Sequence, residues 1–188
     1  MRAGIAERSA AGTIRIERVL AAPRALVFDA WTKPELLLQW YAPHGCTIHY
    51  AGIDVRPGGK FHSCIHNPSF GDCWCVGVYR EIVRPERIVY TLATADSEGK
   101  EIEPAQAGHD PRWPRETLVI VTLEEVRGGT KLTLEQNVSE ALAKHTGAHP
   151  SWLQMLDRLE ALVGTGNTAA QGCANGAGAG CAGAAGNA

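Results

Sequence analysis

The stretch SWLQMLDRLEALV, residues 151–163, decides the fold that we expect for this chain. Its large apolar side chains recur at helical spacing and so share one stripe of a helix; they are Trp152, Met155, Leu156, Leu159, Leu162 and Val163. Ser151 and Gln154 form a pattern typical of a capped helix start, and Gly164 is typical of a stop. A helix of this length is hardly stable alone in water. The apolar stripe must therefore be buried against another surface of the protein.

Most of the chain before this helix alternates apolar and polar residues, as strands do. We expect seven strands, at residues 13–20, 46–55, 60–66, 74–83, 87–93, 115–126 and 131–138. Pro23 and Pro34 each open a helical pattern after the first strand, and the aromatics of these two short helices are interpreted as core residues: Phe28, Trp31, Trp40 and Tyr41. Short turns between the last six strands favour an antiparallel sheet, because parallel crossovers need about a dozen residues. The sequence therefore predicts an α+β domain with a sheet curved around the last helix.

Composition and charge indicate one soluble domain. The chain has 188 residues, of which 45% are hydrophobic and 20% charged, and a formal charge of -2. No cluster of Lys and Arg indicates a nucleic acid or a membrane as partner, and no signal peptide or membrane span is recognised. We therefore expect a cytoplasmic protein with its domain at 13–163. The ends, residues 1–12 and the Gly/Ala-rich 164–188, are expected to be disordered.

Two polar side chains fall on otherwise apolar strand faces. Arg18 lies on the apolar side of the first strand, where a guanidinium needs a carboxylate partner or a ligand; we prefer a structural ion pair. Gln136 shares its side of the last strand with leucines and a valine, so its amide must find hydrogen-bond partners.

Several stretches of the chain resemble one protein family. They are APRALVFDAWTKPELLLQWYAPHG at 22–45, DVRPGG at 54–59, GVYREIVRPERIVYT at 77–91, WPRETLVIVTLEE at 113–125 and TKLTLEQ at 130–136. Together with the closing helix they are similar to homologues of the activator of heat-shock protein 90 ATPase, in the START-like (SRPBCC) superfamily. The resemblance covers about residues 13–163 and implies a helix-grip fold, which agrees with the order of elements.

The resemblance implies less about activity. Members of the superfamily bind lipids or other apolar molecules in a cavity, some are cyclases or dehydratases, and eukaryotic relatives stimulate a chaperone ATPase. We therefore expect a binding protein rather than an enzyme, with an apolar small molecule held between sheet and last helix, no cofactor, and a chaperone as a further partner. The residues expected around the ligand are Trp74, Tyr79, Tyr90, Trp113, Gln136, Trp152, Met155 and Leu159.

A second hypothesis is a cyclase-like or hydrolytic enzyme that uses polar groups in the same cavity. The sequence contains no nucleophile elbow, phosphate-binding loop or zinc-protease helix. The candidates are therefore isolated side chains, namely Tyr79, Tyr90, Glu116, Gln136 and His109. Acid–base catalysis requires at least two of them to converge within about 3 Å of a substrate atom.

A third hypothesis concerns the hairpin formed by 60–66 and 74–83. His62, Cys64 and His66 share one face of the first strand, and Cys73 and Cys75 alternate along the next. If His66 pairs with Cys73, all five side chains share a face and could bind zinc, or Cys64 and Cys75 could form a disulfide. A shift of one residue separates the two groups. We expect an inert outer face, no metal, and reduced thiols.

Overall fold

The computed structural model describes residues 12–172, with side chains described as far as residue 164. Its elements in chain order are β1 (Ile14–Leu20), α1 (Arg24–Thr32), α2 (Pro34–Trp40), β2 (Thr47–Ile53), β3 (Lys60–Asn67), β4 (Gly71–Val83), β5 (Arg87–Thr94), the 3-10 helix η1 (Pro104–Ala107), β6 (Glu116–Val126), β7 (Gly129–Gln136), α3 (Glu140–His145) and α4 (Ala148–Gly172). The order and most of the bounds agree with the prediction from the sequence. No helix in this part of the chain is long and apolar enough to cross a membrane.

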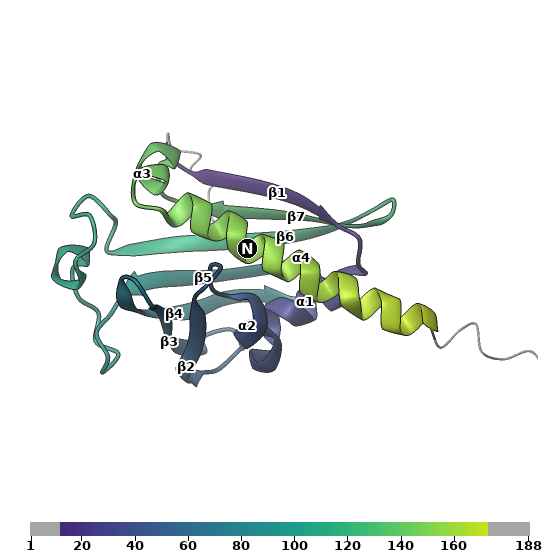
Figure 1. Ribbon diagram of the computed structural model, residues 1–188, viewed down its shortest axis with the longest axis horizontal. Coiled ribbons are helices and arrows are strands. Elements are labelled where there is room, and N and C mark those ends of the chain that lie inside the picture. Colours follow the sequence, from purple (N-terminus) through teal and green to yellow (C-terminus); the bar gives the residue numbers. More distant parts are fainter. Residues whose placement is uncertain (1–11, 173–188) are drawn as a thin grey trace, which may run out of the picture.

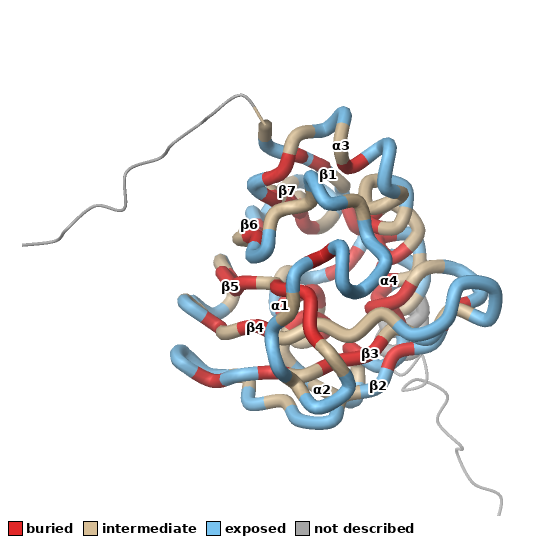
Figure 2. The backbone as a smooth tube through the Cα atoms, turned by 90° about the vertical axis from the view of Figure 1, so that its left-hand side faces the viewer, coloured by how far each residue is buried: buried red, intermediate tan, exposed pale blue. Residues whose placement is uncertain are grey.

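The strands form one antiparallel sheet in the order β1-β7-β6-β5-β4-β3-β2. The first strand returns beside the last, with Ile14 opposite Gln136 and Leu20 opposite Thr130. Figure 1 shows α4 lying across the sheet, with α1 and α2 on the same side near β2 to β4. Seen from the end in Figure 2, buried residues concentrate between the strands and these helices. The predicted α+β architecture is confirmed.

The predicted stripe of α4 forms the centre of this core. Leu156 and Leu159 are fully buried, and Trp152, Met155 and Val163 nearly so, while Leu162 is partly buried. The facing side of the sheet is closed by apolar residues of β6 and β7, namely Val119, Val121, Leu123, Leu132 and Leu134. The helix is therefore held by the surface that its spacing required.

Both predicted ends of this helix are wrong. It begins at Ala148, so Ser151 lies inside it and donates its hydroxyl to the Gly147 carbonyl at 2.8 Å. The Gln154 side chain does not close a capping box, because its Oε1 accepts the backbone N–H of His44 at 3.0 Å. The helix also continues through Gly164 to Gly172, since a single helical glycine costs only about 1 kcal/mol. Part of the tail predicted to be disordered, residues 164–172, is thus helical; residues 1–11 and 173–188 lie outside the described residues.

Two adjacent charged residues fix α4 on both sides. Asp157 Oδ1 accepts from Arg18 Nη2 at 3.1 Å, which confirms the predicted ion pair and ties α4 to β1. Arg158 donates to the carbonyl of Ala42 at 2.7 Å and of Gln39 at 2.8 Å, with longer contacts to two more carbonyls of the same segment. These carbonyls belong to the end of α2 and the loop after it, where helix carbonyls lack partners within the helix. The position of α2 therefore depends on α4.

Gly77 allows β3 and β4 to bring an aromatic ring close to the backbone. A Cβ at this position would lie 2.0 Å from the Thr91 carbonyl oxygen and 2.3 Å from the ring of Phe61. The missing side chain therefore lets Phe61 rest on the inner face of β4.

We expect Gly77→Ala to lower the free energy of unfolding by about 1–3 kcal/mol, because neither the Thr91 backbone nor the Phe61 ring can give way freely. Gly52→Ala is the matched control, since a Cβ there meets nothing within 4 Å. Its effect should stay within about 0.5 kcal/mol. Urea denaturation followed by circular dichroism measures both, and equal stability of the two variants would contradict the prediction.

Candidate functional site

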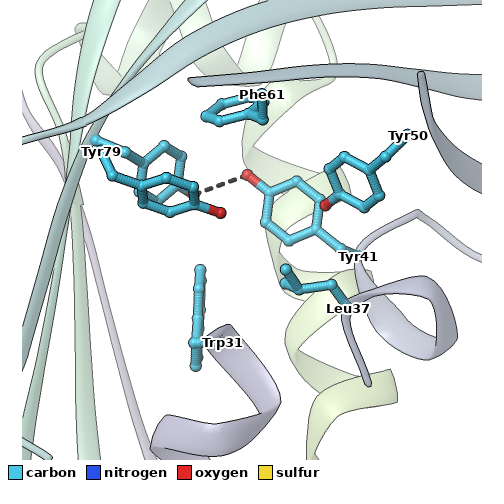
Figure 3. A pocket seen from close by; sticks show the side chains of 7 residues that line it. Trp31, Leu37, Tyr41, Tyr50, Phe61 and Tyr79 are labelled. Carbon is cyan, nitrogen blue, oxygen red and sulfur yellow. Dashed lines mark hydrogen bonds between the residues drawn. The ribbon is translucent and has the colours of Figure 1, made fainter. Parts of the chain in front are cut away.

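A small aromatic cavity lies between the two short helices and the sheet (Figure 3). It is lined by side chains from six elements and the loop after α2, namely Trp31, Leu37, Tyr41, Tyr50, Phe61, Tyr79 and Tyr90. Six of these are buried and Tyr50 is partly exposed, so Tyr50 marks the outer side of the cavity. The free volume is about 10 Å³, which is about the space of one water molecule.

All four tyrosines of the chain line this one cavity. The hydroxyls of Tyr41 and Tyr90 are hydrogen-bonded to each other at 2.7 Å. Tyr50 and Tyr79 have no hydrogen-bond partner among the described residues for their hydroxyls. Figure 3 shows Tyr41, Phe61 and Trp31 around the same small space. The site thus combines aromatic walls with hydroxyls that are free to bind.

Burial keeps these phenols neutral. It raises the pKa of Tyr41 and of Tyr90 well above the ordinary value, and it also raises the pKa of Tyr50 and Tyr79. A neutral phenol can donate or accept a hydrogen bond, but it does not act as a base at neutral pH. The lining residues include no carboxylate, histidine or cation.

Trp31, which lines the cavity, carries a buried donor without a partner among the described residues. Its indole Nε1 is inaccessible to solvent and has no hydrogen-bond partner. The ring is held by neighbouring aromatics, with centroids 4.6 Å from Trp40, 6.1 Å from Tyr41 and 6.5 Å from Trp152. An unsatisfied buried donor costs about 1–3 kcal/mol, which makes it unusual in a structural core.

Both polar atoms of the buried Gln136 amide make hydrogen bonds within the fold. Its Oε1 accepts from Trp152 Nε1 at 2.8 Å, and its Nε2 donates to Thr117 Oγ1 at 2.9 Å. Thr117 in turn donates to the Leu92 carbonyl at 3.2 Å. This chain of hydrogen bonds links α4 to β7, β6 and β5. The expectation that the amide must find partners is confirmed, and both ends of the amide are occupied.

The cavity includes only some of the residues that the sequence places around a ligand. Trp152, Met155 and Leu159 are buried core residues of α4, but they do not line the cavity, which lies beside α4 against α1 and α2. Trp74 is on the opposite face of β4, where its ring packs between His49 and His62 at 5.2 Å and 4.7 Å.

Of the remaining predicted residues, some line the cavity and others do not. Trp113 is partly buried against the core near the end of the long β5–β6 loop, and Glu116 is exposed. Of the predicted ligand residues the cavity brings together Tyr79 and Tyr90. Sequence reasoning missed the others, because it assigned the aromatics of α1 and α2 to the core. For Tyr50 the sequence contained a signal: it lies two residues after Ile48, which is buried, and so shares the inner face of β2 with it.

The register of β3 and β4 contradicts the zinc and disulfide alternatives. Ile65 pairs with Cys73 and Ser63 with Cys75, one residue away from the register that these alternatives need. Cys64 therefore lies opposite Trp74, on the other face from Cys75, and cannot bond to it. The four cysteines of residues 12–164 are free thiols. The described residues contain no group of three or more His, Cys, Asp or Glu arranged to hold a metal.

A curved antiparallel sheet that holds a long C-terminal helix, with two short helices after the first strand, defines a START-like protein of the helix-grip class. The family model described as "Activator of Hsp90 ATPase homolog 1-like protein" matches residues 21–164. The chain therefore belongs to this family.

Solved structures agree with this assignment. A protein from Chromobacterium violaceum is 29% identical with a TM-score of 0.67, covering 81% of this chain and 96% of its own. A protein from Rhizobium leguminosarum is 28% identical with a TM-score of 0.58, covering 81% and 94%. The AHSA1 protein from Silicibacter pomeroyi shares the fold, with 19% identity, a TM-score of 0.64 and coverage of 81% and 98%. No curated protein matches the chain in sequence.

We expect Gln136→Met to lower the free energy of unfolding by about 1–3 kcal/mol, because it leaves the buried Nε1 of Trp152 without an acceptor. Gln39→Met is the control: Gln39 is exposed, and its change should cost less than about 0.5 kcal/mol. Thermal and urea unfolding measure both variants. A Gln136→Met protein as stable as the wild type would mean that the buried chain of hydrogen bonds contributes little.

Proposed function

We propose that this protein binds a small, largely apolar and uncharged molecule in the aromatic cavity between α1, α2 and strands β2 to β5. The observation that carries the proposal is the convergence of all four tyrosines of the chain on this one space. Ligand sites in proteins are mainly apolar, with a few polar groups that fix the orientation of the ligand. Aromatic walls and unpaired hydroxyls fit that description.

The chemistry of the lining defines the ligand class. Tyr50, Tyr79 and Trp31 offer polar groups without partners, and burial keeps the tyrosines neutral. A carbonyl or hydroxyl oxygen would satisfy such donors. A carboxylate or an ammonium group would be buried without a counter-charge, at a cost of several kcal/mol. The ligand is therefore an apolar molecule with one or two neutral oxygen atoms.

Binding requires the cavity to open. Its volume of about 10 Å³ is far below the roughly 300–1,000 Å³ typical of ligand pockets. Tyr50 stands at the partly exposed side, and Leu37 and Tyr41 close the cavity from α2. The end of α2 is held by Arg158. Ligand entry would move Tyr50 and this end of α2 away from the sheet.

Binding is favoured over catalysis by the state of the polar groups. The second hypothesis requires converging acid and base groups, but Gln136 is occupied, Glu116 is exposed, and Tyr79 and Tyr90 are neutral. A chaperone partner and a cytoplasmic location stay predictions that derive from the family and the composition. Chaperone ATPase turnover that is unchanged by this protein would contradict the first.

Tyrosine-selective ring labelling offers a direct test, because every tyrosine signal in an NMR spectrum then comes from the cavity. Ligands identified by native mass spectrometry of freshly purified protein, or small aromatic ketones as probes, should shift these signals. In a phenylalanine-labelled sample the signals of Phe28 and Phe70, which do not line the cavity, serve as the control, whereas Phe61 lines it and should shift with the tyrosines. Shifts of Phe28 or Phe70 without tyrosine shifts would place the binding elsewhere.

We expect Tyr79→Phe to weaken binding about tenfold, as loss of one hydrogen bond to the ligand does. The stability of the unliganded protein should change little, since the Tyr79 hydroxyl has no partner to lose. Tyr90→Phe, in contrast, should also destabilise the free protein, because it breaks the bond to Tyr41. Titration calorimetry and urea unfolding separate the two effects; equal affinity of Tyr79→Phe and wild type would argue against the role of this hydroxyl.

Affinity should be constant between about pH 6 and about pH 9. The pKa of Tyr79 and of Tyr90 is raised by burial, so both phenols stay protonated across this range and bind no fewer protons at its upper end. Titrations at several pH values check this. An affinity that falls as the pH approaches about 9 would show that a lining phenol ionises, against the burial seen here.

A further inference from the structure

The inner face of β4 continues beyond the tyrosine cavity to two cysteines. Tyr79, Gly77, Cys75 and Cys73 alternate along the strand and so share this face. Cys75 lies opposite Ser63 and Cys73 opposite Ile65 on β3. The long loop between β5 and β6, at the end of the sheet in Figure 1, brings His109 to the same place. His109 Nε2 lies 3.7 Å from Cys73 Sγ.

The three side chains have different protonation states. The neighbouring Cys75 thiol and the contact with His109 together lower the pKa of Cys73 to about 5. The same contact raises the pKa of His109, and the neighbouring Cys73 sulfur and burial raise the pKa of Cys75. From β3, Cys64 acts electrostatically on Cys75, and burial raises the pKa of Cys64 itself. At neutral pH Cys73 is therefore a thiolate, Cys75 is a protonated thiol, and His109 holds its proton to a higher pH than an ordinary imidazole does.

We propose that Cys73 is a peroxide-reactive thiol and that Cys75 resolves its oxidised form into a Cys73–Cys75 disulfide. Reactive cysteines combine an ionised sulfur, partial exposure and a neighbouring thiol. Both cysteines are intermediate in exposure, and His109 is exposed, so a small hydroperoxide can reach the sulfur. Neither the fold nor the proposed cavity ligand requires this cluster.

The chemistry balances with a hydroperoxide as the oxidant. The Cys73 sulfur attacks the terminal oxygen, an S–O bond forms and the O–O bond breaks; the departing alkoxide or hydroxide takes a proton from solvent or from His109, whose pKa is raised by the contact with Cys73. Cys73 is then a sulfenic acid, and the peroxide has been reduced by two electrons. The Cys75 sulfur next attacks the Cys73 sulfur, an S–S bond forms, and the hydroxyl group leaves as water with the Cys75 proton.

The strand geometry makes this disulfide reversible. Residues two apart on a strand have Cα atoms about 6.6 Å apart, near the upper end of the roughly 4.4–6.8 Å that disulfides span, and their Cβ atoms are equally far apart, so the bond forms only if the strand bends at Trp74 to bring the Cβ atoms within about 4.5 Å. Such a bond is strained and more easily reduced than a structural one. The pair therefore suits a response to oxidants better than permanent cross-linking.

Intact-mass analysis after brief treatment with hydrogen peroxide tests the proposal. All proteins carry Cys173→Ser and Cys181→Ser, so that the tail cysteines do not contribute. The protein with Cys73 and Cys75 should lose two hydrogen atoms and regain them with a dithiol reductant. Cys75→Ser should instead gain one oxygen atom and be labelled by dimedone at residue 73, and Cys73→Ser should do neither. Cys46→Ser is the matched control and should behave as its parent.

Contrary results are equally clear. Gain of oxygen by the parent protein without loss of hydrogen would overturn the resolving role of Cys75. Oxidation of Cys73→Ser at the same rate as its parent would overturn the assignment of Cys73. Every variant should give the parent's circular dichroism spectrum, because each change replaces one sulfur by one oxygen.

The pH dependence of alkylation by iodoacetamide provides a second test. If Cys73 and His109 had only structural roles, the pH midpoint of Cys73 alkylation would be that of an ordinary thiol. Cys73 should reach half of its maximal rate near pH 5, whereas an ordinary thiol does so near about pH 8.5. His109→Asn should move this midpoint upward and slow the reaction at about pH 6 roughly tenfold, since the counter-charge is lost. An ordinary midpoint in the unmodified protein, or no shift in His109→Asn, would overturn the role given to the cluster.

Discussion

The packing of α4 against the concave face of the sheet is the constraint on which the other features of this protein depend. Leu156 and Leu159 are fully buried there, so the apolar stripe of α4 is covered by the sheet and leaves little apolar surface for a ligand. Asp157 and Arg158 then fix the helix to β1 on one side and to the end of α2 on the other. Because α4 fills the space above β6 and β7, the remaining cavity lies beside it, where α1 and α2 cover β2 to β5.

The cavity inherits its chemistry from this arrangement. Aromatic rings from α1, from the loop after α2 and from four strands meet there, and the missing side chain of Gly77 lets the Phe61 ring approach β4 closely. The buried chain from Trp152 through Gln136 to Thr117 satisfies the polar groups at the α4 side. Unpaired polar groups are left on the other side, toward Tyr50, Tyr79 and Trp31. A family fold thus supplies the frame, and this chain's own aromatic residues define the site.

The thiol cluster and the cavity occupy one face of β4. Cys75 is near enough to Tyr41 for the two groups to interact electrostatically, whereas Cys73 contacts His109 at the other end. The cysteine pair and the cavity are therefore linked through the same strand. Ligand binding in the cavity and oxidation of the thiols are measured separately, but both sites lie on β4.

The sequence alone determined the order of elements, the buried stripe of α4 and the need of Arg18 and Gln136 for partners, because these follow from the period of apolar residues along a single segment. The tertiary structure decided which partners they found, namely Asp157 for Arg18, and Trp152 and Thr117 for Gln136. It also decided the register of β3 and β4, since a shift of one residue at the turn moves Cys64 and Cys75 to opposite faces without changing either strand's pattern. The cavity could not be predicted from the sequence either. Periodicity assigns each side chain to one face of its own helix or strand, whereas the packing of separate elements decides which faces surround a cavity.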